Sequence, residues 1–207
     1  PTQNCDVFAE VSGLLKAAAV SLAKIAGDLR LLSSGPRAGF GEIVLPAVQA
    51  GSSIMPGKVN PVICEAVNQA AFQIMADDLA VTLASQAGQL ELNAFLPLIA
   101  KALLEMLDLL DHILPLFIER CIKGIQANRE NCSRKVSESY ILATALTGLM
   151  GYDKASQVAA LCLETGKTVR EIVLERRLLD EKTLAEILKP ERLTAPTAGK
   201  EKTKWEI

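Results

Sequence analysis

The sequence predicts an all-α protein, a long-helix bundle followed by a small helical C-terminal domain. Apolar residues recur in steps of three and four over unusually long stretches, as expected for amphipathic helices. Clusters of Gly and Pro separate these stretches, and after Gly124 the periodic segments become much shorter. We find no convincing strand pattern and no internal repeat.

The composition suits a globular protein with a large core. The chain has 207 residues, of which 50% are apolar, and its net charge is -2. This balance gives no reason to expect nucleic acid or an anionic membrane surface as a partner. Lysines interrupt every apolar run before it reaches membrane-spanning length. The five cysteines are scattered without a Cys-x-x-Cys pair, which indicates reduced thiols in a cytoplasmic protein.

The first predicted helix covers residues 6–32 and is nearly thirty residues long. Its apolar stripe comprises Val7, Val11, Leu14, Ala18, Leu22, Ile25, Leu29 and Leu32. Ser33-Ser34-Gly35-Pro36 ends it. Helices of this length and alanine content can pack in a self-contained bundle or against other copies, and their length favours the oligomer.

Two further long helices are predicted, the second from Pro61 to about Ser85. Its inward residues should be Ile63, Val67, Ala70, Ile74 and Leu79. The third follows Pro97 and continues to about Gly124, with a kink expected at Pro115.

The expected domains are residues 1–124, a partial helical bundle, and residues 125–193, a small helical domain. Short helices are predicted at residues 128–138, 140–149, 153–164, 169–176 and 181–188. Thr168 and Glu171 fit a capping box, and Asp180 can cap the last of these helices. The polar tail, residues 194–207, is expected to be disordered.

The most informative stretch is the loop at residues 51–61, Gly51-Ser-Ser-Ile-Met-Pro-Gly-Lys-Val-Asn60-Pro61. It gathers hydroxyl, ammonium and carboxamide groups, which together can hold a small carboxylate. Asn60-Pro61 reads as an N-cap followed by proline at the first helical position. A turn-rich connection of this length inside a helical protein is usually functional.

This loop resembles the signature loop of the fumarase/aspartase superfamily, whose members eliminate a group across a C–C bond to give fumarate. The resemblance extends to about Leu193 and corresponds to slightly under half of a family subunit, its C-terminal part. The flanks are more similar to the aspartase branch, as in Ala87-Gly-Gln-Leu-Glu-Leu-Asn93. The chain departs from the pattern at Thr147-Gly148, where members usually carry Asn-Pro. Because the chain also begins without Met, we expect it to be a fragment of a larger protein that is inactive alone.

The resemblance implies an ammonia-lyase that converts L-aspartate to fumarate and ammonia through an aci-carboxylate intermediate. It also implies a homotetramer whose central bundle is shared among subunits, with no organic cofactor and no catalytic metal. Fumarate hydratase shares the loop and is the alternative within the superfamily. A non-catalytic helical scaffold that kept the fold is the alternative from another class.

By resemblance, Ser52 is the catalytic base, while Ser53, Lys58 and Asn60 bind the substrate carboxylates. Glu65 is implied to contact a histidine from the part of the subunit that lies outside this chain. Each has a structural alternative: a turn hydroxyl for either serine, a solvated charge for Lys58, a capping side chain for Asn60. A glutamate in a first helical turn, such as Glu65, is also favourable to the helix dipole.

Other candidates are weaker. His112, the only histidine, is expected to form an i,i+4 pair on a solvated face with Asp108 instead of a metal site. Asp77-Asp78 is interpreted as a polar helix face. Trp205 has no assigned role, and none of the cysteines has a partner at a readable spacing.

Overall fold

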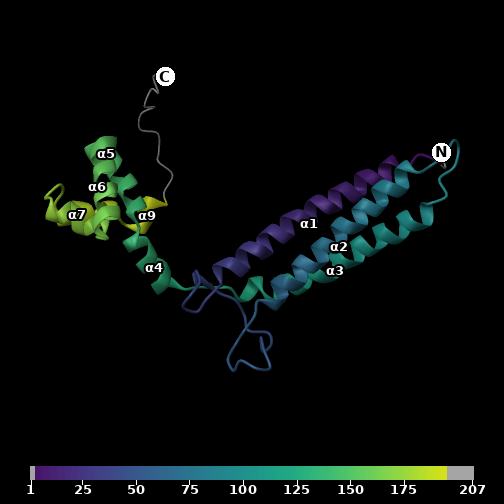
Figure 1. Ribbon diagram of the computed structural model, residues 1–207, viewed down its shortest axis with the longest axis horizontal. Coiled ribbons are helices and arrows are strands. Elements are labelled where there is room, and N and C mark those ends of the chain that lie inside the picture. The colour runs from purple at the N-terminus through teal and green to yellow at the C-terminus, as the bar shows by residue number, and fades with distance from the viewer. Residues whose placement is uncertain (1–2, 195–207) are drawn as a thin grey trace, which may run out of the picture. The chain divides into compact units, whose positions relative to one another are not determined.

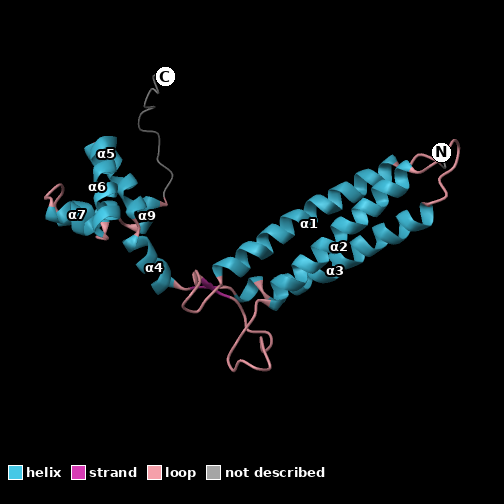
Figure 2. Cartoon of the chain, viewed as in Figure 1, coloured by secondary structure: helices cyan, strands magenta, loops and turns pink. Residues whose placement is uncertain are grey.

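The structure is a computed structural model that describes residues 3–194 of the chain. It divides into two compact units, the first ending at Arg129 and the second beginning at Glu130. Nearly all regular structure is helical, as predicted (Figure 2). Among the described residues, none of the helices is both long and apolar enough to cross a membrane.

The first unit is built on α1 (Asp6–Leu32), α2 (Val62–Gln86) and α3 (Leu96–Arg120), which lie side by side (Figure 1). The bounds of α1 agree with the prediction, and those of α2 differ by one residue. The third helix continues through Pro115 and ends at Arg120, and the short 3-10 helix η1 (Ile122–Gly124) follows it. Helix α2 packs against both of the others.

The buried face of α1 differs from the predicted stripe. Its fully buried residues are Ser12, Ala19 and Ala26, whereas Val7 and Leu14 are 68% and 67% exposed. Small side chains allow the backbones of α1 and α2 to approach closely. Of the predicted stripe, Leu22 and Leu29 are partly buried and pack against a cluster that includes residues of α2. In α2 the prediction is confirmed for Val67, Ala70 and Ile74, which are buried, and wrong for Leu79, which is exposed.

The interpretation of Asp77-Asp78 as a polar helix face is wrong, because both side chains are buried. Asp78 accepts hydrogen bonds from Ser12 Oγ at 2.7 Å and from Lys16 Nζ at 2.6 Å, both on α1. Burial is possible because a neighbouring helix supplies these donors, which a local pattern on α2 cannot reveal.

A short strand pair also departs from the prediction of no strand. Strand β1 (Ile43–Val44) pairs antiparallel with β2 (Gln126–Ala127), with Ile43 opposite Ala127. It joins the connection between α1 and α2 to the segment that follows α3. A Cβ on Gly124 would lie 2.4 Å from Pro46 Cγ, so this segment lies directly against the connection.

The second unit contains short helices, with bounds that mostly agree with the prediction: α4 (Arg129–Glu138), α5 (Thr147–Met150), α6 (Tyr152–Thr165), α7 (Val169–Glu175) and α8 (Glu181–Ile187). The segment Tyr140–Leu146 is a 3-10 helix, η2, and α9 (Pro190–Leu193) was not predicted. The capping box of Thr168 and Glu171 and the Asp180 cap are both confirmed. The predicted disordered tail, residues 194–207, lies outside the described residues except for Thr194, so Trp205 is outside them too.

The departure at Thr147-Gly148 has a visible consequence in the second unit. Helix η2 passes directly into α5, and Thr147 has helical φ and ψ angles of -55° and -39°. A proline at position 148 would disfavour that conformation at residue 147. The glycine therefore permits a continuous helical segment here.

Candidate active site

The signature loop, residues 51–61, connects β1 to α2 and projects from the end of the helical bundle (Figure 1). The Gly51 N–H donates to the Lys58 carbonyl at 2.6 Å and closes the loop on itself. A Cβ at Gly51 would lie 2.8 Å from Asn60 N, so the close approach requires glycine. Gly57 adopts a positive φ of 77°.

Ser52 lies at the base of this loop, and its Oγ accepts two backbone hydrogen bonds. The donors are Ile54 N and Met55 N, each at 3.1 Å. This is the geometry of a turn serine, the structural alternative raised above. The same two N–H groups would also stabilise negative charge on Oγ, because hydrogen bonds to the charged form favour deprotonation. The turn geometry is thus compatible with catalysis.

Ser53 and Lys58 are exposed on the loop. Within residues 3–194, no hydrogen bond or ion pair joins the Lys58 ammonium to another group. A lysine without an internal partner can be recruited by an anion from solution, and the exposed Ser53 hydroxyl can donate to the same ligand.

The expected N-cap at Asn60 is wrong. Helix α2 begins at Val62, Pro61 occupies the N-cap position, and no side chain caps it. The Asn60 Nδ2 instead donates to the Gly51 carbonyl at 3.2 Å. Asn60 therefore ties the two ends of the loop together, and one of its amide donors is already used inside the loop.

Glu65 lies in the first turn of α2, where the helix dipole favours a carboxylate. Its carboxylate forms an ion pair with Arg30 Nη2 of α1 at 3.5 Å. Sequence reasoning assigned no role to Arg30 or to its neighbour Asn68. The spacing of Glu65 and Asn68 puts them on one face of α2, but no local signal indicates that Arg30 reaches them.

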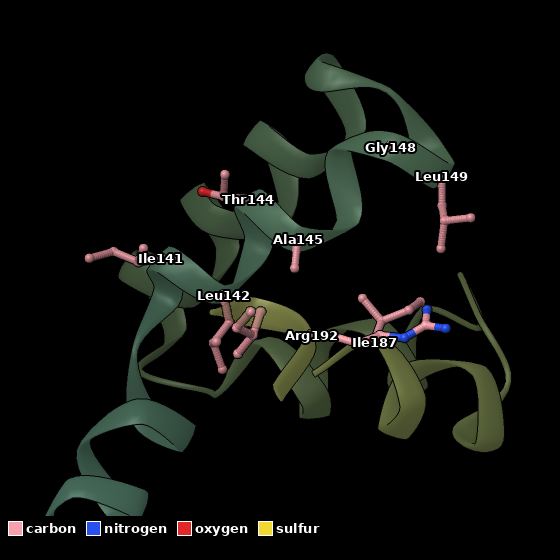
Figure 3. A pocket seen from close by; sticks show the side chains of 9 residues that line it. Ile141, Leu142, Thr144, Ala145, Gly148, Leu149, Ile187 and Arg192 are labelled. Atoms are coloured by element: carbon pink, nitrogen blue, oxygen red, sulfur yellow. The ribbon is translucent and has the colours of Figure 1, made fainter. Parts of the chain in front are cut away.

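A cavity of 710 Å³ lies in the second unit, and none of the predicted site residues lines it. Figure 3 shows its lining, which is mostly apolar with Arg192 and Thr144 as polar members. It lacks the combination of hydroxyl, ammonium and carboxamide groups found in the loop. We therefore base the candidate site on the loop chemistry.

Two minor candidates are settled by their contacts. His112 Nδ1 lies 3.4 Å from the Asp108 carboxylate on an exposed face, so the predicted i,i+4 pairing is confirmed.

Two of the cysteines form a pair that the sequence did not reveal. The Sγ atoms of Cys64 and Cys121 lie 3.6 Å apart. Burial raises the pKa of the Cys64 thiol to about 12, so Cys64 is a poor nucleophile.

Comparison with known proteins supports the family resemblance that this loop indicates. A family model described as "Lyase" matches residues 1–76, and one described as "Fumarase C C-terminus" matches residues 142–195. Aspartate ammonia-lyase from Pseudomonas aeruginosa is 52% identical over 94% of the chain, and that from Escherichia coli is 48% identical over the same share. The chain belongs to the fumarase/aspartase superfamily. It spans 41% of the length of these curated relatives.

Solved structures of the superfamily have the same fold as this chain. A cobalt-bound fumarate lyase:delta crystallin from Brucella melitensis superposes with a TM-score of 0.88 at 50% identity, covering 93% of this chain and 42% of that one. A class II fumarase from Schistosoma mansoni gives the same TM-score at 38% identity, covering 95% of this chain and 41% of that one. The resemblance identified from the loop is confirmed by these similarities.

Proposed function

We propose that the whole protein, of which this chain is a part, is an ammonia-lyase that converts L-aspartate to fumarate and ammonia. The observation that carries the proposal is the high identity to aspartate ammonia-lyases across nearly the whole chain, signature loop included. The alternative, fumarate hydratase, has weaker support, because the identity to a class II fumarase is 38%, against 52% to an aspartate ammonia-lyase.

In the proposed reaction, the Ser52 alkoxide removes a proton from the carbon beside one substrate carboxylate. The electrons of the C–H bond move into that carboxylate and give an aci-carboxylate. When this electron pair moves back from the aci-carboxylate, it forms the C=C bond of fumarate, while the C–N bond breaks and the nitrogen leaves with its bonding electrons as ammonia. Ser52 is suited to this task because two N–H groups already point at its Oγ.

The negative charge that develops on the aci-carboxylate makes the largest contribution to the activation barrier. Fixed donors and a cation around its oxygens therefore give the largest stabilisation of the transition state. Lys58 supplies the cation. Ser53 and the second amide N–H of Asn60 orient the carboxylate by donating hydrogen bonds to it. Glu65 acts together with a histidine from outside this chain. The reaction needs no organic cofactor and no nucleic-acid partner, and we assign the protein to the cytoplasm.

We further propose a homotetramer in which long helices of several subunits share one bundle. The support is the exposed apolar surface of the long helices, including Val7, Leu14 and Leu104, which are each about two-thirds exposed in this chain. In the whole protein, Leu14→Lys should shift sedimentation toward smaller species. Glu10→Lys, an exposed polar site on the same helix, should leave the assembly unchanged.

The deciding experiment assays the whole protein with aspartate and, separately, with malate. We expect fumarate from aspartate; turnover of malate alone would favour the hydratase, and turnover of neither would favour a non-catalytic scaffold. This chain by itself should be inactive.

Ser52→Ala tests the base. It should lower kcat by about 10⁴-fold or more without changing assembly. Ser139→Ala is the matched control, because Ser139 Oγ also accepts a backbone N–H, from Ile141, in a turn remote in sequence from the loop. Equal effects of the two substitutions would reduce Ser52 to a turn serine.

A further inference from the structure

The Glu65 side chain is connected to a second helix through a chain of polar contacts. Arg30 Nη2 on α1 lies 3.5 Å from Glu65 Oε1. When the Asn68 amide is oriented to satisfy both of its neighbours, its oxygen accepts from Arg30 Nη1 at 3.2 Å and its nitrogen donates to the Ala23 carbonyl at 3.2 Å. The contacts thus run from the α1 backbone through Asn68 and Arg30 to Glu65.

Arginine is well suited to this position because its guanidinium is planar and presents several donors in a fixed arrangement. One terminal nitrogen faces Asn68 and the other faces Glu65. A lysine could serve only one of these partners well. The geometry therefore fixes the direction from which a positive charge meets Glu65.

Simple stabilisation does not account for this arrangement. The side chains of Arg30 and Glu65 are 43% and 35% exposed, and ion pairs at that exposure contribute little to folding. On α1, Lys24 pairs locally with Asp28 one turn away, whereas Lys16 reaches across to the buried Asp78 of α2. Arg30 also reaches across to α2, but its partner is the partly exposed Glu65, the residue to which the superfamily resemblance gives a role in catalysis.

We propose that Arg30 is a positioning residue that, with Asn68, holds the Glu65 carboxylate in the orientation required by its histidine partner. This inference rests on the proposed function, because it takes the role of Glu65 from there. Without Arg30, Glu65 would rotate freely and meet its partner in the correct geometry for only part of the time. Small losses of alignment at a reacting group can cost about 100-fold in rate.

The proposed substrate-binding groups Ser53, Lys58 and Asn60 lie on the loop, and among the described residues none of them forms a hydrogen bond or ion pair with Arg30. The effect of losing Arg30 should therefore fall on kcat and leave KM for aspartate nearly unchanged. A general structural defect would instead lower the thermal midpoint or alter both constants.

The test uses the whole protein with Arg30→Ala, Arg30→Lys and the matched control Lys24→Ala, which removes an exposed lysine that pairs locally on the same helix. Arg30→Ala should lower kcat about 10- to 100-fold at constant KM and thermal midpoint. Arg30→Lys should recover less than half of that loss on a logarithmic scale, and Lys24→Ala should resemble the wild type. Added guanidinium ion should raise the kcat of Arg30→Ala and not that of Lys24→Ala. An unchanged kcat, or a loss that appears only in KM, would overturn the inference.

A double-mutant cycle with Glu65→Gln separates this inference from the proposed function. If Arg30 acts through Glu65, Arg30→Ala should cost little more once Glu65→Gln is present. A large loss from Glu65→Gln with none from Arg30→Ala would refute the positioning role and leave the proposed function standing. Turnover of malate in place of aspartate would refute the proposed substrate, and the same cycle would then be measured with malate.

Discussion

The two units of the chain are held together in different ways. The second unit buries one continuous apolar cluster, whose members include Leu146, Val173 and Leu184. The first unit has three smaller clusters in which alanine and cysteine are prominent. The side chains of Ser12, Asp77, Asp78 and Asn93, which are the buried polar residues among those described, all belong to the first unit.

This difference indicates how each unit obtains a unique structure. In the second unit, large apolar side chains and capped helices stabilise the fold locally. In the first unit, small residues bring long helices close together, and buried hydrogen bonds fix how they align. Both units also leave large apolar side chains exposed, as Leu14 in the first and Ile141 in the second show, so this exposure does not distinguish them.

Leu184→Ala should have the largest effect on stability, because the Leu184 side chain is fully buried in the second unit. We expect a loss of about 2–5 kcal/mol in the free energy of unfolding of this unit, measured by denaturant titration. Leu193→Ala is the control, since Leu193 is 36% exposed. If both substitutions cost equally little, the second unit does not depend on the core described here.

Asp78→Asn should destabilise the first unit by roughly 1–3 kcal/mol, because it weakens the contacts to Lys16 and Ser12. Burial by itself would raise the pKa of Asp78, but the hydrogen bonds from Lys16 and Ser12 outweigh it, and the net pKa lies below its usual range. A lowered pKa in the folded state gives stability above the pKa of the unfolded state. That stability is lost as the pH falls through the folded pKa.

The pH dependence of unfolding in wild type and Asp78→Asn checks this assignment. The stability difference between them should shrink as the solution becomes more acidic. Asp28→Asn, on an exposed ion pair with Lys24, should produce little change. A difference that stays constant with pH would contradict the assignment.

Thr168→Ala removes the reciprocal capping box of α7 and should destabilise the second unit by about 1 kcal/mol. The hydrogen bonds from the Thr168 N–H and hydroxyl lower the pKa of Glu171, so the effect of the substitution should diminish in acid. Thr165→Ala is a suitable comparison, because the Thr165 hydroxyl donates to the Leu161 carbonyl in the last turn of α6. Equal losses would mean that the cap contributes nothing specific.

Asp77→Asn should have the smallest effect and the opposite sign from Asp78→Asn. Burial raises the pKa of Asp77, and one of its oxygens is buried without a hydrogen-bond partner among the described residues. A raised pKa means that stability is present at low pH and lost as the pH rises through the folded pKa. Removing the charge should therefore stabilise the protein at neutral pH, by less than about 1 kcal/mol. Destabilisation in denaturant titration at pH 7 would show that the Asp77 charge has a partner in the assembled protein.

Much of the local structure was predictable from the sequence. The periodicity of α1 gave its bounds, and the capping residues Thr168 and Asp180 lie where their side chains satisfy the first N–H groups of a helix. The loop at residues 51–61 was recognisable because its unusual combination of groups is contiguous. The N-cap at Asn60 was misassigned because the Asn60 side chain had a competing acceptor, the Gly51 carbonyl, at the other end of the loop.

The sequence by itself determined where most of the helices begin and end, because these bounds depend on neighbours along the chain, and it singled out the loop on which we propose the chemistry takes place. Only the tertiary structure decided which face of α1 is buried, that Asp78 meets Lys16, that Cys64 meets Cys121, and that Arg30 reaches Glu65. Each of these contacts joins residues far apart in sequence. Their free energy depends on how closely two helices approach, and a one-dimensional pattern does not contain that distance.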